Sequence, residues 1–247
     1  MNKIANNIIV LQEVDSSNNY ANRLILTDSA EHGAVVLTHY QKNGKGQAEN
    51  HWESEANKNL LASIILFPDF IPADKQFYLS KITSLAITDL LEMYSDNITI
   101  KWPNDIYYRN KKIAGILIEN SVKGNFLTST ILGMGINVNQ EKFISGAPNP
   151  VSLKQITGKE LDIYKLAQQL ISKIHQWYEM LDSGQLNEID FVYRNKLFRK
   201  KQWAWYKKNG KKFKARITGT GELGQLFLED PEGKTKAYFF KEVEFVI

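Results

Sequence analysis

Residues 101–105 read KWPND, and residues 112–119 read KIAGILIE. Pro103 fixes one backbone angle and holds the tryptophan before it in an extended conformation, so a new strand is expected at the Asn-Asp pair that follows. The second piece is strongly apolar after Lys112, as expected of a buried strand. A lysine at the start of such a strand faces either solvent or a cleft.

Outward from this stretch, short β-rich runs alternate with segments of helical periodicity. The clearest helix has apolar residues at every third or fourth position between Ile163 and Leu181. A short turn at 123–125 predicts a hairpin between its two flanking strands. Strands are expected at 8–13, 34–40, 60–67, 98–101, 105–108, 113–122 and 126–134, and helices at 17–26, 74–94, 163–181 and 186–197. This mixture predicts an α+β domain over residues 1–198.

The pattern changes at about residue 198, after which only short strands are expected. They fall at 202–206, 212–218, 225–228, 235–240 and 242–246, with glycine-containing turns between them. A run of small strands of this kind predicts a little β-barrel, residues 199–247, appended to the larger domain.

The composition narrows the class of protein. The 247 residues include 43% hydrophobic and 23% charged side chains and no cysteine. Without cysteine, disulfides, thiol catalysis and iron–sulfur sites are excluded, and a reducing cytoplasm fits best. Residues 1–7 do not resemble a signal peptide, and the longest apolar run, 60–67, is far shorter than the ~20 residues of a membrane-spanning helix. We therefore expect a cytoplasmic protein with no membrane partner.

A second unusual stretch, residues 41–52, reads QKNGKGQAENHW and follows an expected strand. Gly44 and Gly46 allow backbone amides to turn toward an anion, and Lys45 between them adds a positive charge. The same composition also suits a plain flexible connection. Taken alone, the loop leaves both interpretations open.

Five motifs, in this order, resemble the biotin protein ligases (biotin–[acetyl-CoA-carboxylase] ligases). They are a polar triplet that opens the first helix, a glycine loop that ends in tryptophan, a KWPND strand, a K-hydrophobic-AGI strand and a G-hydrophobic-GIN turn. In this chain they fall at 15–18, 41–52, 101–105, 112–116 and 133–137. The resemblance implies the α+β, class II synthetase-like mixed sheet of that family, followed by a small SH3-like β-barrel.

The resemblance also implies a two-step reaction. Biotin and ATP, with Mg²⁺, give biotinyl-5′-adenylate and pyrophosphate, and a lysine of a biotin carboxyl carrier protein then displaces AMP. An anion must approach a polyanion in the first step, so fixed cations are needed. The expected partner is the carrier of acetyl-CoA carboxylase or a related carboxylase. We expect a monomer or homodimer that does not bind DNA, because the first triplet leaves no room before it for a winged helix.

The motifs assign roles to individual residues. Lys112 matches the catalytic lysine, and Asp105 matches an acidic position that takes or orients the proton of the attacking amine. Biotin contacts are expected from Ser16, Ser17, Asn18, Gln41, Gly44, Lys45, Gly46, Gln47, Lys112 and Gly115, and ATP contacts from Lys45, Trp52, Asn104 and Asn137. No protein side chain is assigned to the metal ion.

The glycine loop departs from the family pattern, which often reads Gly-Arg-Gly-Arg with a later arginine. This chain has lysine and glutamine at those positions, Lys45 and Gln47, and then Asn50. Lysine keeps a charge without the arginine fork, and glutamine keeps only hydrogen bonding. We therefore expect the adenylate to be released more readily than from an arginine-bearing relative.

Two alternative functions stay open. A lipoate or octanoate ligase of the same fold would have a pocket for an aliphatic tail in place of groups suited to the ureido ring. A nucleic-acid-binding protein is suggested by residues 194–216, which contain 11 Lys or Arg and no Asp or Glu, with Trp203 and Trp205 among them. The same basic segment, on a chain of net charge +4, also suits a surface that guides an acidic carrier domain or ATP.

Overall fold

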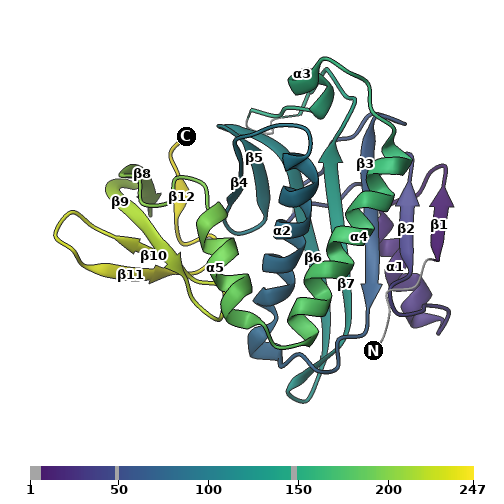
Figure 1. Cartoon of the computed structure of the whole chain (residues 1–247), viewed down its shortest axis with the longest axis horizontal. Coiled ribbons are helices and arrows are strands. Elements are labelled where there is room, and N and C mark those ends of the chain that lie inside the picture. Colours follow the sequence, from purple (N-terminus) through teal and green to yellow (C-terminus); the bar gives the residue numbers. More distant parts are fainter. Residues whose placement is uncertain (1–6, 48–49, 146–148) are drawn as a thin grey trace.

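A seven-stranded mixed sheet forms the centre of the computed structural model, which describes residues 7–47, 50–145 and 149–247 (Figure 1). Its strand order is β1-β2-β3-β7-β6-β5-β4. β1 runs parallel to β2, and the other neighbouring pairs are antiparallel. The strands are β1 (Ile8–Leu11), β2 (Val35–Thr38), β3 (Asn59–Leu66), β4 (Ile98–Lys101), β5 (Asp105–Tyr108), β6 (Lys111–Lys123) and β7 (Phe126–Asn137).

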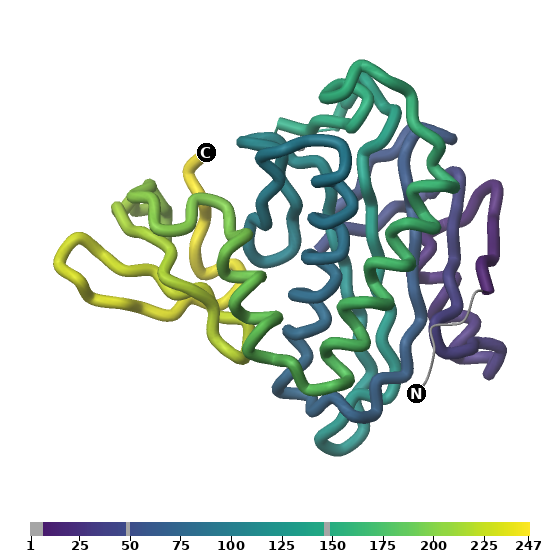
Figure 2. The backbone as a smooth tube through the Cα atoms, in the orientation of Figure 1, coloured from purple at the N-terminus to yellow at the C-terminus, as the bar shows by residue number. Residues whose placement is uncertain are grey.

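Helices cover both faces of this sheet. α2 (Phe77–Glu92) and α4 (Ile163–Asp182) lie side by side on one face (Figure 2), and α1 (Ser17–Leu26) covers the other. Successive strand residues therefore enter different cores, Val35 on the α2 side and Val36 on the α1 side, as the two-residue period of a strand requires. The remaining helices are α3 (Leu153–Thr157), α5 (Leu186–Lys196) and a 3₁₀ turn at Ala73–Lys75.

A second sheet of five antiparallel strands follows α5, in the order β11-β10-β9-β8-β12. Its strands are β8 (Ala204–Lys208), β9 (Lys211–Thr220), β10 (Leu226–Glu229), β11 (Thr235–Tyr238) and β12 (Glu244–Phe245). It docks on the edge of the larger sheet, where the Trp102 indole donates to the Gly224 carbonyl at 2.8 Å. The Phe198 ring packs against both Tyr107 and Phe245, and so joins the two sheets.

A buried ion pair fixes α5, and with it the start of the second sheet. The Lys81 ammonium of α2 lies 2.5 Å from Asp190 Oδ1, and the Tyr78 hydroxyl donates to the other carboxylate oxygen at 2.9 Å. Desolvation lowers the pKa of Lys81, although the carboxylate opposes this. Such a charge is tolerated in the interior because it is paired and hydrogen-bonded.

Most predicted elements are confirmed, and the error lies within a motif. α1 and α4 match the expected helices, and β6 and β7 form the expected hairpin. One placement is wrong. Residues 133–137, expected as a turn, lie inside β7, where pairing with β3 and β6 on both sides keeps them extended. Residues 102–104 form the turn between β4 and β5, in agreement with the strands expected at 98–101 and 105–108. α3 escapes prediction because five residues are too short to show periodicity.

Candidate active site

The fold brings segments far apart in the sequence around one cavity of about 200 Å³. It lies between the start of α1, the loop at 41–52, the β4–β5 turn and strands β6 and β7. Of the predicted site residues, its wall contains Ser16, Ser17, Asn18, Gln41, Lys45, Gly46, Gln47, Trp52, Asn104, Asp105, Lys112 and Gly115. Gly44 and Asn137 lie outside this wall.

The end of the cavity at α1 is built from polar side chains that hold one another in place, all of them buried except Glu119, which is exposed. The Ser17 backbone N–H donates to Gln41 Oε1 at 2.7 Å, and the Ser63 hydroxyl of β3 donates to Asn18 Oδ1 at 2.6 Å. The Asn18 amide donates in turn to Glu119 Oε2 at 2.7 Å. We call this arrangement, Ser16–Asn18 with Gln41, Ser63 and Glu119, the polar end of the cavity. It is organised before any ligand enters.

Ser63 and Glu119 lie outside the cavity wall but hold Asn18 in place, and the sequence analysis did not identify them. Ser63 is a single serine within the apolar run at 60–67, and Glu119 closes another apolar run, so neither has a local signal. A polar residue at the centre of a fully buried strand is the clue that could have found Ser63, because such a group needs a partner.

Outside the cavity, an aspartate steadies the start of α1. Asp15 Oδ1 lies 2.8 Å from the Arg23 guanidinium, and its other oxygen accepts from the Asn19 amide at 2.6 Å. The hydrogen bond from Arg23 holds the pKa of Asp15 well below its usual range, despite some burial. The pair fixes the turn that delivers Ser16 to the polar end.

The opposite end of the cavity is charged. Lys112 Nζ lies 2.6 Å from Asp105 Oδ1, and Lys101 Nζ lies 3.8 Å from Asp105 Oδ2. Strand register explains this cluster, since Lys101 stands directly opposite Asp105 in the β4–β5 pair and β6 supplies Lys112 from the other side. We call these three residues the charged end. One carboxylate is thus shared by two ammonium groups.

Lys101 is a site residue that the sequence analysis missed, although it stands within the KWPND motif. Its ammonium lies 5.4 Å from the centre of the Tyr107 ring and 5.0 Å from that of Phe245, a residue of the second sheet. Desolvation lowers the pKa of Lys101, with Lys112 adding to the effect and Asp105 opposing it. The charged end is therefore closed on one side by aromatic rings.

Trp52 lies between the two ends. Its ring centre is 5.5 Å from Lys112 Nζ, and its indole lies against Gly115 and Gly135, which face each other across the β6–β7 pair. A Cβ at either glycine would collide with the indole, and a Cβ at Gly133 would overlap the Asn18 amide. The glycines of these motifs therefore make room for neighbouring side chains.

The glycine loop forms a small hairpin. The Gly46 N–H donates to the Asn50 carbonyl at 2.7 Å, and the Trp52 N–H donates to the Gly44 carbonyl at 2.9 Å. The Gly46 amide therefore closes the hairpin, and the expectation that backbone amides of this loop turn toward an anion stays a prediction. Gln47 Oε1 is buried without a partner among the described residues. Residues 48–49 of this predicted ligand loop lie outside the described residues.

The two asparagines assigned to ATP are engaged in backbone contacts. The Asn104 amide donates to the Ile116 carbonyl at 2.8 Å, and the Ile116 N–H donates back to the Asn104 carbonyl at 2.9 Å. Asn137 is buried, and its amide donates to the Val151 carbonyl at 3.2 Å. Asn104 still lines the cavity, whereas Asn137 supports the segment behind it.

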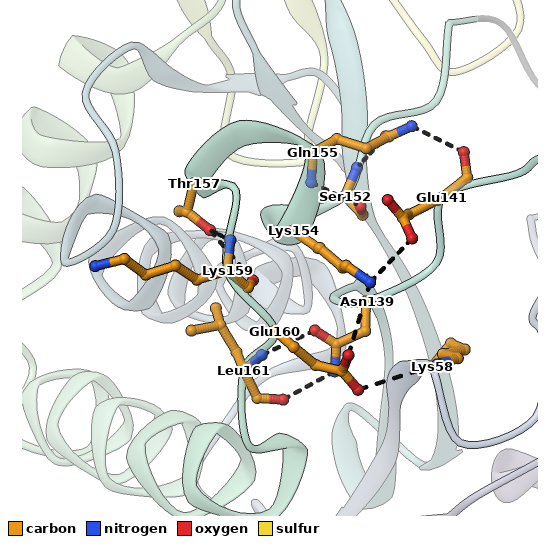
Figure 3. A network of polar contacts seen from close by, with 10 residues as sticks. All are labelled: Lys58, Asn139, Glu141, Ser152, Lys154, Gln155, Thr157, Lys159, Glu160 and Leu161. Atoms are coloured by element: carbon orange, nitrogen blue, oxygen red, sulfur yellow. Dashed lines mark hydrogen bonds and ion pairs between the residues drawn. The ribbon is translucent and has the colours of Figure 1, made fainter.

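Figure 3 shows the polar network that holds the chain after β7. The Asn139 side chain donates to the Leu161 carbonyl at 2.8 Å and accepts from the Leu161 N–H at 2.9 Å. Lys154 bridges Glu141 and Glu160, at 2.9 and 3.6 Å. The segment that follows β7 is thereby tied to the connection between α3 and α4.

The described residues contain no cluster of three or more His, Asp or Glu side chains arranged to hold a metal ion. Asp105, the acidic side chain in the described cavity wall, already faces two ammonium groups. In the same part of the chain, no helix has the length and apolar character needed to cross a membrane.

Comparison with known proteins agrees with this geometry. Residues 10–137 match the biotin/lipoate A/B protein ligase family, and the chain belongs to that family. The biotin–[acetyl-CoA-carboxylase] ligase of Paracoccus denitrificans is 30% identical over 70% of this chain and 74% of its own length. The bifunctional ligase/repressor BirA of Bacillus spizizenii is 28% identical over 93% of this chain and 72% of its own length.

A solved structure shares the whole fold. The biotin protein ligase from Aquifex aeolicus in complex with biotin and ATP superposes with a TM-score of 0.81 at 24% sequence identity. The match covers 98% of this chain and 100% of that one, so both sheets are included. The expected fold class is confirmed.

Proposed function

We propose that this chain is a biotin–[acetyl-CoA-carboxylase] ligase, which activates biotin as biotinyl-5′-AMP and transfers it to a lysine of a biotin carboxyl carrier protein. The observation that carries the proposal is the cavity with two unlike ends. Lys112, Asp105 and Lys101 gather charge at one end, and the other end offers hydrogen-bonding groups that hold one another in place. Family membership supports the same assignment.

The polar end suits the ureido ring of biotin, which is neutral and needs both donors and acceptors. Ser16, Ser17, Asn18 and Gln41 supply such groups within the wall. The aliphatic tail of lipoate or octanoate, the nearest alternative substrates, offers no partner to the donors and acceptors that these side chains do not use among themselves, at a cost of about 1–3 kcal/mol for each one left unpaired. Biotin is therefore the substrate that the cavity favours.

The first step joins the biotin carboxylate to the α-phosphorus of ATP, and the bond from that phosphorus to pyrophosphate breaks. In the ligand-free arrangement the Lys112 ammonium is occupied by Asp105 at 2.6 Å. The biotin carboxylate and the ATP phosphate, arriving together, compete with Asp105 for this ammonium and draw it toward the reacting atoms. A fixed cation there stabilises the charge that develops on the phosphate oxygens.

The second step uses the carboxylate that the first step releases. Once Lys112 turns to the substrates, Asp105 keeps Lys101 as its remaining partner and presents one oxygen to the incoming amine. The carrier lysine is about 99.9% protonated at neutral pH, and must lose a proton before its nitrogen attacks the carbonyl carbon. AMP leaves, and an amide remains. Lys45 and Trp52 cover the adenylate during this exchange.

Among the described residues of the cavity wall, Asp105 is the one acidic side chain that magnesium could use. Asp105 is committed to two lysines, and the described residues offer no cluster of carboxylates and histidines beside it. Mg²⁺ would therefore accompany the phosphates of ATP rather than occupy a site built by the protein. The reaction and its partner are consistent with the cytoplasmic location expected from the sequence.

The decisive assay is biotin-dependent exchange of labelled pyrophosphate into ATP. The purified chain should catalyse the exchange with biotin and show no exchange with lipoate or octanoate. Exchange with lipoate or octanoate instead of biotin would reassign the substrate. Absence of exchange with all three acids would reject the ligase assignment.

A further inference from the structure

The second sheet carries a groove that the two chemical steps do not use. It encloses about 590 Å³, and three aromatic side chains, Trp205, Phe213 and Tyr238, form part of its wall. Lysines surround them, and one carboxylate, Asp230, stands among them. We call this site the lysine groove, after Lys208, Lys211, Lys214, Lys234 and Lys236.

Within the described part of the chain, the positive charge of the five groove lysines is only partly neutralised by Asp230 in the wall and by Glu232 beside Lys234. The β8–β9 hairpin places Lys208 directly opposite Lys211, and the adjacent pair in the ladder is also two lysines. Like charges in direct opposition destabilise an antiparallel pair. Among the described residues, Lys234 is the groove lysine with an ion-pair partner, Glu232 at 2.9 Å. An anionic partner would relieve this repulsion.

The wall of the groove indicates what kind of anion fits. Trp205 is 53% exposed, so a large apolar surface is open beside the ammonium groups. Lys208 Nζ lies 4.9 Å from the centre of the Tyr238 ring, which keeps the charge over an aromatic face. A small inorganic anion needs no such surface. A protein surface that combines carboxylates with apolar side chains matches both properties.

The groove also lies next to the catalytic cavity along the chain. Tyr238, the last residue of β11, forms part of the groove wall, and Phe240, two residues later, forms part of the cavity wall. Figure 1 shows the five strands of this sheet gathered on the α5 side of the molecule, beside β4 and β5, which carry Lys101 and Asp105. A protein seated in the groove would therefore lie close to the charged end.

We infer that the lysine groove docks an acidic face of the carrier domain and thereby holds its target lysine at the cavity. The inference rests on the proposed ligase function, since it concerns the partner of the second step. Because the groove takes no part in the cavity wall apart from the shared 238–240 segment, it contributes to carrier recognition and not to adenylate formation.

The test is a triple charge reversal, Lys211→Glu, Lys214→Glu and Lys236→Glu, at three exposed positions. The probe is the apo biotin carboxyl carrier domain of an acetyl-CoA carboxylase. We expect kcat/KM for this domain to fall about tenfold or more at low salt, mainly through KM, and the salt dependence of the parent to disappear. Biotin-dependent pyrophosphate exchange, and transfer of biotin to hydroxylamine as a small acceptor, should stay within about twofold of the parent.

A matched control makes the same change of charge elsewhere, with Lys159→Glu, Lys165→Glu and Lys173→Glu at and before α4. This control should keep the parental KM for the carrier domain. If the groove reversal does not fold, the corresponding triple glutamine variant replaces it, with a smaller loss in the same direction.

Two outcomes would overturn the inference. One is an unchanged carrier KM in a folded groove variant. The other is a single-stranded oligonucleotide that binds the parent at physiological salt and not the variant, while carrier kinetics stay the same, which would make the groove a nucleic-acid site. Absence of biotin-dependent exchange in the parent is a different failure, because it rejects the ligase function itself.

Discussion

The two ends of the catalytic cavity are built on opposite principles. At the polar end, Ser63 and Gln41 bond with Asn18 and Ser17 at 2.6 and 2.7 Å, so side chains are fixed by neighbours that remain in place when a ligand binds. At the charged end, Lys112 is held by Asp105, a partner that it must give up before it can contact substrate. The polar end is preorganised. At the charged end, the Lys112 ammonium stays paired with Asp105 until a substrate anion competes for it.

This difference separates binding from chemistry. A preorganised neutral site loses little conformational entropy when it binds a neutral ring, and so contributes affinity. A paired lysine contributes little until the substrate carboxylate and phosphate are both present, and then stabilises the transition state. Substitutions at the two ends should therefore change different kinetic constants.

The largest effect is expected from Lys112→Ala. Loss of one fixed charge stabiliser should lower the rate of biotin-dependent pyrophosphate exchange by roughly 10²–10³-fold, with little change in the KM for biotin. Lys111→Ala, at the adjacent and exposed position of β6, is the control and should keep parental exchange. If Lys112→Ala instead raises the biotin KM and leaves kcat unchanged, the division between the two ends is wrong.

Two glycine substitutions should separate the binding of biotin from the binding of ATP. In Gly133→Ala the new methyl group overlaps the Asn18 amide, and in Gly135→Ala it meets the Trp52 indole. A displaced, buried hydrogen-bond partner costs about 1–3 kcal/mol, so Gly133→Ala should raise the dissociation constant of biotin about tenfold and leave that of ATP near the parental value. Gly135→Ala should weaken ATP more than biotin. Titration calorimetry measures the dissociation constants of biotin and ATP for each variant. Equal losses of affinity for the two ligands would contradict the distinction between the two ends of the cavity.

A smaller effect is expected in the loop. Gln47 Oε1 is buried without a partner among the described residues, and this position carries no charge to retain the adenylate. Gln47→Arg should slow the release of biotinyl-5′-AMP by a few-fold to about tenfold, since one added hydrogen bond to the phosphate contributes a net ~0.5–1.5 kcal/mol. Release is measured by rapid filtration of labelled adenylate, with Gln47→Met as the uncharged control. Release as fast as in the parent would contradict the expected leak.

The smallest effect concerns the support behind the polar end. Arg23 lowers the pKa of Asp15 in the folded state. The ion pair therefore adds to the free energy of unfolding above the ordinary aspartate pKa of about 3.9, and this contribution is lost as the pH falls below that value. The unfolding free energy of Asp15→Asn should therefore fall less than that of the parent between about pH 4 and pH 2.5. The difference should be less than ~1 kcal/mol, because the ion pair is so exposed. Urea midpoints at several pH values test this, and parallel curves for the two proteins would contradict it.

Much of the fold followed from local pattern. α1 and α4 were predictable because their apolar residues recur with the helical period, and the β6–β7 hairpin because a glycine turn separates two apolar runs. The motif residues that line the cavity were predictable because the family pattern places chemistry at particular positions.

The rest depends on contacts that no local pattern encodes. Lys101 becomes part of the site through its place opposite Asp105 in the β4–β5 register, and Phe245 reaches it from a sheet formed about 140 residues later in the chain. The placement of 133–137 in a turn failed for the same reason, since two glycines in five residues suggest a turn, whereas strands on both sides keep them extended. Tertiary pairing overrides glycine preference here.

The hydrogen bond from the Trp102 indole to the Gly224 carbonyl has a practical consequence for chimaeric enzymes. The tryptophan of the KWPND motif fixes the second sheet to the larger one, so this part of the motif serves the packing of the two sheets more than ligand recognition. Grafting the C-terminal strands of one ligase onto the body of another should succeed where the grafted loop between β9 and β10 presents a backbone oxygen at the position of Gly224. Grafts that displace this oxygen should misplace Lys101 and Asp105, and lose turnover even when both halves are intact.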